Sequence, residues 1–153
     1  MSISSLSALV LLTLLLTSHS AFAANGTHPS TPSSDERTLI QLNASERSAV
    51  LAEMRGFLHS TQQIVSAVAV SDMQLAADSA RKSGRSAAEQ MPSTLRSKLP
   101  PAFKKLGSDT HRRFDALALD AEQLGDETHT LSQLGELLGN CVACHAIFRI
   151  GAE

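Results

Sequence analysis

The chain has 153 residues, a length typical of one domain rather than two. Hydrophobic residues make up 42% and charged residues 18%, so the composition is that of a globular protein and not of a disordered tail. The net charge of −2 and the absence of Trp and Tyr argue against nucleic-acid binding, which needs basic surfaces and aromatic faces.

The first 23 residues have the pattern of a signal peptide. The segment from Ala8 to Leu16 is apolar but too short to span a bilayer, and residues 21–23 read A-F-A, which fits a cleavage site. Lys and Arg are absent before Ala8, so an uncleaved anchor helix is the alternative. We expect export, cleavage, and a periplasmic mature chain that begins at Ala24 and has no membrane span.

Residues 24–42 are rich in Ser, Thr, Pro and Asn, which predicts a flexible leader ahead of a folded domain over residues 43–153. Asn43 and Glu46 have the spacing of a capping box, in which each side chain binds the backbone N–H of the other. Apolar residues then recur at helical spacing. We therefore expect a first helix over about 44–70.

A second helix is predicted to follow directly. Ser71 and Gln74 repeat the capping spacing, and the helical pattern fades by Gln90. Its interior is rich in Ala, which suits close approach to a neighbouring helix. Residues 91–99 are then expected to form a connector with one helical turn.

The third helix is predicted to open at Pro100 and Pro101, since Pro is tolerated in a first helical turn, and to end at Gly125. The fourth is predicted from about Thr130 to Ile150. No segment shows sustained alternation of β-branched and polar residues, which would indicate strands. We therefore expect an all-α protein, an antiparallel four-helix bundle that packs around a covalently attached haem.

The haem is inferred from the sequence Cys141-Val142-Ala143-Cys144-His145. A C-x-x-C-H motif is typical of c-type haem attachment, with both cysteines bound to the porphyrin as thioethers and the histidine bound to the iron. Positions three and four apart share one face of a helix, so all three side chains can reach one ligand. We expect one covalent haem c with His145 as the proximal iron ligand, facing the helix bundle core.

Two other readings of the cysteine pair fit the sequence less well. A thioredoxin-like redox pair begins a helix just after a strand, whereas Cys141 lies late in a predicted helix. A structural zinc site needs four ligands, and the chain has only these two cysteines and no paired histidine spacing. A chance occurrence of the motif is the remaining alternative, and the predicted export favours haem.

The position of the motif in the last helix resembles the class II c-type cytochromes, the cytochrome c prime family. The resemblance covers about Asn43 to Arg149, and its most specific part is LGELLGNCVACHAIFR from Leu134 to Arg149. Phe148 stands where the family usually has Tyr. The resemblance implies that Arg149 lies on the proximal side of the haem, although a solvated cation at the helix end is the alternative.

In that family the first helix contacts the distal face of the haem, and two alignments remain open. If Arg47 matches the family arginine near a haem propionate, Leu51 takes the distal position over a five-coordinate iron. If Met54 and Arg55 match the Met-basic pair of six-coordinate members, Met54 is the sixth ligand. A shift of three residues keeps the same helix face, so both alignments are sterically possible.

Other interpretations of these side chains are less specific. Met54 can simply fill the core, the commonest use of a methionine in a helical stripe. His59 and His111 could complete a bis-histidine site, but each is more often an exposed or packed histidine.

The resemblance implies one of two functions, and neither is enzymatic. The first is a mono-haem electron carrier between protein redox partners, with Met54 as the distal ligand. The second is a module that binds NO or CO at a site guarded by Leu51. A homodimer is a further implication. A basic cluster could steer an acidic partner, or it could be an ordinary solvated face: Lys98, Lys104, Lys105, Arg112 and Arg113.

Overall fold

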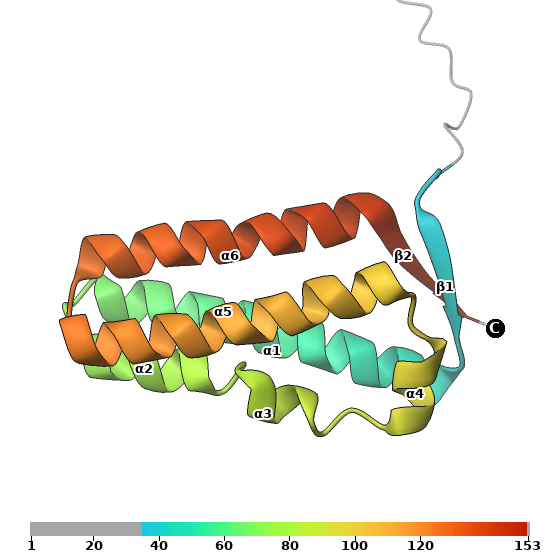
Figure 1. The fold of residues 1–153 in the computed structure, drawn as a ribbon, viewed down its shortest axis with the longest axis horizontal. Coiled ribbons are helices and arrows are strands. Elements are labelled where there is room, and N and C mark those ends of the chain that lie inside the picture. The colour runs from blue at the N-terminus through green and yellow to red at the C-terminus, as the bar shows by residue number, and fades with distance from the viewer. Residues whose placement is uncertain (1–34, 153) are drawn as a thin grey trace, which may run out of the picture. The chain divides into compact units, whose positions relative to one another are not determined.

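The computed structural model describes residues 35–152, so the predicted signal peptide and residues 24–34 of the predicted leader lie outside the described part. The described chain is predominantly helical, as predicted (Figure 1). Its elements are β1 (Thr38–Leu42), α1 (Ala44–Val68), α2 (Met73–Arg81), α3 (Arg85–Ala88), α4 (Ser93–Lys98), α5 (Pro101–Leu124), α6 (Glu127–Ile147) and β2 (Phe148–Ala152).

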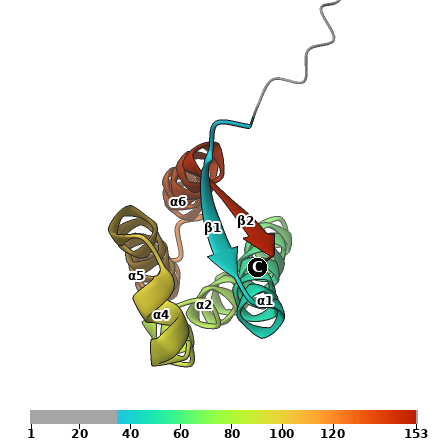
Figure 2. The same ribbon diagram turned by 90° about the vertical axis from the view of Figure 1, so that its right-hand side faces the viewer.

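The helices pack side by side around an apolar interior. α2 contacts both α1 and α5, and α5 contacts α6, whereas α1 and α6 contact each other much less (Figure 2). One apolar cluster lies among these four helices and includes Ile64, Phe114, Leu117 and Leu137, which are all fully buried or nearly so. None of the helices formed by residues 35–152 is long and apolar enough to cross a membrane.

The predicted start of the first helix and the predicted end of the third helix are confirmed. The Asn43 side chain accepts a 3.0 Å hydrogen bond from the Glu46 backbone N–H, and the Glu46 carboxylate accepts one from the Asn43 N–H. At the end of α5, Gly125 adopts a left-handed conformation with φ of 62°, which glycine tolerates without steric cost. The predicted turn of helix in the connector is present as α4.

The predicted second helix is wrong in its start and its length. Asp72, not Ser71, caps α2, because its carboxylate accepts a hydrogen bond from the Leu75 N–H while Ser71 has a φ of 58°. The helix ends at Arg81, and the short helix α3 begins at Arg85. A side chain at Gly84 would meet the carboxylate of Asp115, which would have to move to make room for it.

The chain also contains a two-stranded parallel sheet that was not predicted. β1 pairs with β2 along its whole length, so that Thr38 lies opposite Phe148 and Leu42 lies opposite Ala152. The prediction of a flexible leader up to Leu42 is therefore wrong for β1, and the prediction that the fourth helix reaches Ile150 is wrong for β2. The reason is burial of alternate residues: Ile40 and Leu42 pack in a second apolar cluster with Phe148.

Candidate functional site

The C-x-x-C-H motif lies in the last turns of α6, directly before β2. Cys141 and Cys144 are half-buried, whereas His145 is exposed. The prediction that the side of α6 carrying the motif faces the bundle core is only partly correct. Leu134 and Phe148 are buried, but Leu138 and His145 lie at the surface, because this side of α6 has little contact with α1.

The two cysteine thiols are free and are kept in their protonated form. Burial raises the pKa of Cys141 above its ordinary value. The pKa of Cys144 is also raised, mainly by burial and to a lesser extent by the nearby Cys141 thiol. Reactive redox pairs show the opposite, a thiol pKa lowered by nearby cations or a helix N-terminus. The surroundings of the pair therefore do not resemble those of a disulfide oxidoreductase.

One pocket brings together most of the residues that the sequence singled out. It has a volume of about 250 Å³ and lies between the start of α1, the end of α6 and β2. Six of the seven predicted site residues line it, and Cys141 is the exception. The lining residues are Arg37, Arg47, Leu51, Met54, Phe103, Cys144, His145, Phe148, Arg149 and Ile150.

Both candidates for the distal position therefore lie on the pocket wall. Leu51 and Met54 are half-buried neighbours on one face of α1, three residues apart. The two alignments of the first helix remain open at this point. His59 is exposed and His111 is buried elsewhere, and neither lines this pocket, so the geometry does not favour a bis-histidine site.

Three arginines give the pocket a cationic rim. Arg37 was not among the predicted site residues, since it lies in the predicted leader and no pattern marks it. Its guanidinium binds both carboxylate oxygens of Asp35 and donates a 3.3 Å hydrogen bond to the backbone oxygen of His145. The hydrogen bond from Arg37 lowers the pKa of Asp35 to about 2.

Arg149 contributes the second of these cations, and its hydrogen bonding is incomplete. Its Nε lies 3.6 Å from the Asp35 carboxylate, beyond hydrogen-bond distance. The same atom is buried without a hydrogen-bond partner. Arg47, the third cation, is exposed at the start of α1. An anionic group in the pocket would satisfy these donors.

Two rows of apolar side chains continue from the pocket along α1 and α6. On α1 the row is Leu51, Leu58 and Val65, and on α6 it leads back from His145 through Leu138 to Leu131. Each row has a seven-residue spacing, which keeps its members on one side of the helix. Apart from half-buried Leu51, all of these side chains are exposed. We call the two rows the α1–α6 seam.

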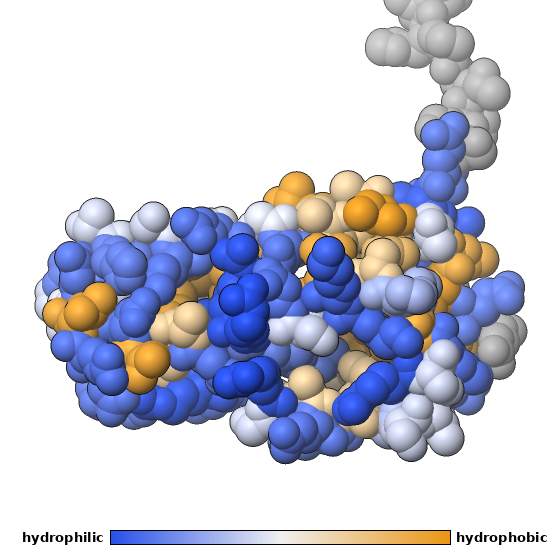
Figure 3. All heavy atoms as spheres, in the orientation of Figure 1, coloured by the Kyte–Doolittle hydropathy of each residue, from blue (hydrophilic) through white to orange (hydrophobic). Residues whose placement is uncertain are grey.

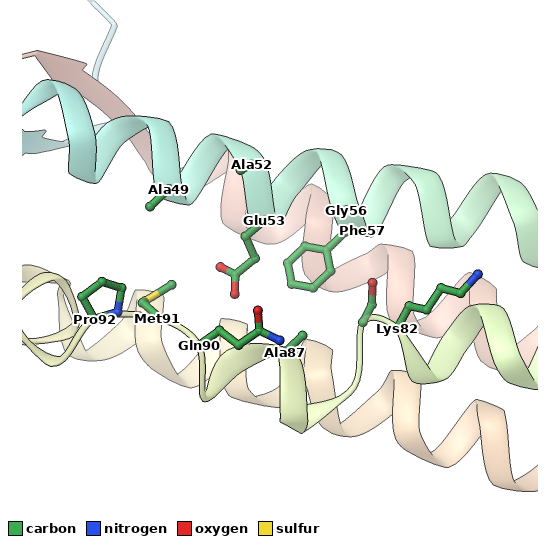
Figure 4. A pocket seen from close by; sticks show the side chains of 11 residues that line it. Ala49, Ala52, Glu53, Gly56, Phe57, Lys82, Ala87, Gln90, Met91 and Pro92 are labelled. Carbon is green, nitrogen blue, oxygen red and sulfur yellow. The ribbon is translucent and has the colours of Figure 1, made fainter.

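A different pocket of about 260 Å³ lies between α1 and the α3 region (Figure 4). The carboxylate of Glu53 points into it, beside Phe57 and opposite Gln90 and Met91. One oxygen of that carboxylate lies 3.3 Å from Nε2 of the buried His111. None of the predicted haem-site residues lines this pocket.

Comparison with known protein families, with curated proteins and with solved structures found no match to this chain.

Proposed function

We propose that this protein is a periplasmic mono-haem c-type cytochrome of class II, an antiparallel four-helix bundle that carries single electrons between protein redox partners. The observation that carries the proposal is the pocket described above. Residues from a C-x-x-C-H motif and residues from the start of α1, about 90 positions earlier in the chain, line the same cavity. The motif was selected from the sequence itself, and the residues of α1 were selected through the resemblance to the class II c-type cytochromes.

The donor set of the pocket fits a haem. Cys141 and Cys144 would each add a thiol S–H across a porphyrin vinyl group, which forms two thioethers. His145 would supply the proximal nitrogen. When bound, the haem iron supplies reversible one-electron oxidation and reduction.

The remaining groups fit the two ends of such a ligand. A haem carries carboxylates, and the pocket offers Arg47 and the unsatisfied Nε of Arg149. The cavity volume of about 250 Å³ is slightly below the range of about 300–1,000 Å³ typical of cofactor sites. The exposed apolar side chains of the α1–α6 seam supply the further apolar surface that a macrocycle needs.

The chain's own residues then have distinct tasks. The hydrogen bond from Arg37 holds the backbone of His145, the residue that would bind the iron. Buried Phe148 and half-buried Leu51 limit the access of water to the cavity. A low local dielectric strengthens the electrostatic effect of the arginines on a charged cofactor.

A second candidate function follows from Leu51. It lines the cavity as Met54 does, and a leucine there would leave the distal iron position open to NO or CO. Met54 as ligand would instead close that position and favour electron transfer. The two functions therefore differ in one side chain of α1.

Optical spectroscopy of the purified protein, expressed with haem-attachment machinery, tests the proposal. We expect covalent haem that is lost in the double variant Cys141→Ala/Cys144→Ala, while His59→Ala, a change at an exposed histidine outside the pocket, retains it. Low-spin spectra that CO does not alter, with a Met-to-iron band lost in Met54→Ala, would establish the electron carrier. High-spin spectra that CO shifts promptly would establish gas binding under Leu51. A protein without covalent haem would refute both.

A further inference from the structure

The end of α6 that carries the motif is apolar on its solvent side as well as on its buried side. From Leu137 to Ile147 the helix contains no Asp, Glu, Lys or Arg. Val142 is 71% exposed and Ile147 45% exposed. Figure 3 shows hydrophobic residues gathered on the surface over this part of α6. A solvent-facing helix side normally carries charged residues, so an apolar one of this kind marks an interaction surface.

We call this surface the α6 patch and define it by its exposed members Val142, Ala146 and Ile147. It surrounds the motif on the side of α6 that faces away from the helix interior. Haem bound through Cys141, Cys144 and His145 would lie against the neighbouring side of the same turns. The patch therefore lies on the same turns of α6 as the proposed haem-binding motif.

Charge is distributed unevenly along the molecule. Three segments lie toward the end of the molecule where β1 and β2 are found: residues 35–59, 93–107 and 137–152 (Figure 1). Together they contain eight Lys or Arg and four Asp or Glu. Residues 60–92 and 108–136, toward the other end, hold five Lys or Arg against ten Asp or Glu. The end that carries the motif is therefore basic and the opposite end is acidic.

Several cations at the basic end are available for an external partner. Among the described residues, the exposed side chains of Arg55, Lys104 and Lys105 form no ion pair. The sequence had grouped Lys104 and Lys105 with Arg112 and Arg113. Those two arginines instead form ion pairs: both pair with Asp109, and Arg113 also pairs with Glu136.

We infer that the α6 patch, together with the exposed cations at the same end of the molecule, is a docking surface for an acidic redox protein, one whose contact face combines carboxylates with an apolar area. The inference rests on the proposed cytochrome function, which gives the partner a reason to approach the motif. The uncharged patch would form the dry centre of the interface, and the cations would form its polar rim. The opposite charge at the far end would orient the molecule during the encounter.

An anionic membrane surface would attract the same cations, but the sequence favours a protein. Segments that bind such membranes carry four to eight clustered Lys or Arg. At the basic end the longest run of adjacent cations is the pair Lys104-Lys105, and four acidic residues lie among the basic ones. A few separate cations at the same end as an apolar patch are the combination found in the polar rim and apolar core of a protein interface.

Stopped-flow kinetics of the haem-loaded protein test the inference. Two reductants are compared: reduced flavodoxin, an acidic redox protein, and a neutral hydroquinone that needs no docking surface. We expect Lys105→Glu to slow reduction by flavodoxin by about 3- to 10-fold at low ionic strength, and expect salt to reduce the difference. The matched control Lys82→Glu, an exposed lysine in the acidic half, should change that rate by less than about 1.5-fold.

The outcomes separate the two proposals. Equal rates for Lys105→Glu and Lys82→Glu with flavodoxin, alongside normal reduction by hydroquinone, would refute the docking surface and leave the cytochrome function intact. A protein that neither hydroquinone nor excess dithionite, a much stronger reductant, can reduce would refute the cytochrome function itself. Co-sedimentation with vesicles of phosphatidylcholine and phosphatidylserine that is lost in Lys105→Glu would assign the surface to a membrane and overturn the inference.

Discussion

The guanidinium of Arg37 donates a 3.3 Å hydrogen bond to the backbone carbonyl oxygen of His145, 108 residues later in the chain. Carbonyls in the last turn of a helix have no partner within the helix, so this bond satisfies one of them. The residue that precedes β1 thereby holds the end of the helix that carries the motif. The segment before α1 is part of the site and not only a tether to it.

Removal of the buried side chain of Leu42 tests whether β1 belongs to the folded domain. Leu42 is fully buried, so Leu42→Ala should lower the free energy of unfolding by about 2–5 kcal/mol. Leu39 on the same strand is 39% exposed, and Leu39→Ala should cost markedly less. Urea denaturation of both variants measures the difference. Equal, small effects would show that β1 is not packed as described.

Replacement of Arg149 tests the cationic rim of the proposed haem site. A cation near the haem stabilises the reduced iron, which carries one positive charge less than the oxidised iron. Arg149→Gln should therefore lower the midpoint potential by roughly 20–60 mV, where about 59 mV corresponds to a tenfold change for one electron. Potentiometric titration measures this, with Arg55→Gln outside the pocket as control. Equal potentials in the two variants would contradict the assignment of Arg149 to the cofactor.

The buried His111 should make stability depend on pH. Burial alone would lower the pKa of His111, but hydrogen bonds to Glu53 and to the Ser83 carbonyl raise it above its ordinary value of 6.5. A raised folded-state pKa means that protonated His111 stabilises the fold fully below about pH 6.5, and that this contribution is lost as pH rises through the raised value.

The measurement is the free energy of unfolding in urea as a function of pH. The wild-type protein should lose stability as pH rises from 6 to 9, and His111→Gln should show a flatter profile. The control His59→Gln, at an exposed histidine, should keep the wild-type slope. A wild-type slope in His111→Gln would show that the imidazole does not titrate against Glu53.

Two glycine-to-alanine substitutions should change the stability of the protein in opposite directions. Gly125 has a φ of 62°, where a side chain is strained, so Gly125→Ala should destabilise the protein by about 1–2 kcal/mol. Gly107 lies inside α5 with open space around its Cα, so Gly107→Ala should stabilise it by roughly 0.5–1 kcal/mol. Thermal denaturation of both variants checks the prediction. Destabilisation by Gly107→Ala would indicate a contact that the helix geometry does not provide.

The helices were predictable because their signals are local. The capping box of Asn43 and the left-handed stop at Gly125 are contained in a few consecutive residues. The break between α2 and α3 was missed, and the contacts found there come from another helix: the carboxylate of Asp115 on α5 accepts hydrogen bonds from the backbone N–H and the guanidinium of Arg85. The strands were missed because residues 38–42 become a strand only by pairing with residues 148–152.

The candidate site was likewise predictable where its signals are local in sequence and not where they depend on contacts between distant segments. The motif was visible in five consecutive residues, and the resemblance to the class II c-type cytochromes singled out Arg47, Leu51 and Met54 on α1, which line the pocket. Arg37 carried no signal, since its place in the site depends on the sheet. Helical spacing also predicted a buried His145, whereas the weak contact between α1 and α6 leaves it exposed.

The parallel pairing of β1 with β2 also determines which part of the chain can be studied on its own. A fragment that begins at Asn43, where the capping box suggests the domain starts, would lack β1. β2, which pairs only with β1, would then have unpaired N–H and C=O groups along both edges, which favours association between molecules. The apolar cluster around Phe148 would also lose Ile40 and Leu42. Such a fragment should aggregate, and a fragment that begins at Asp35 should not.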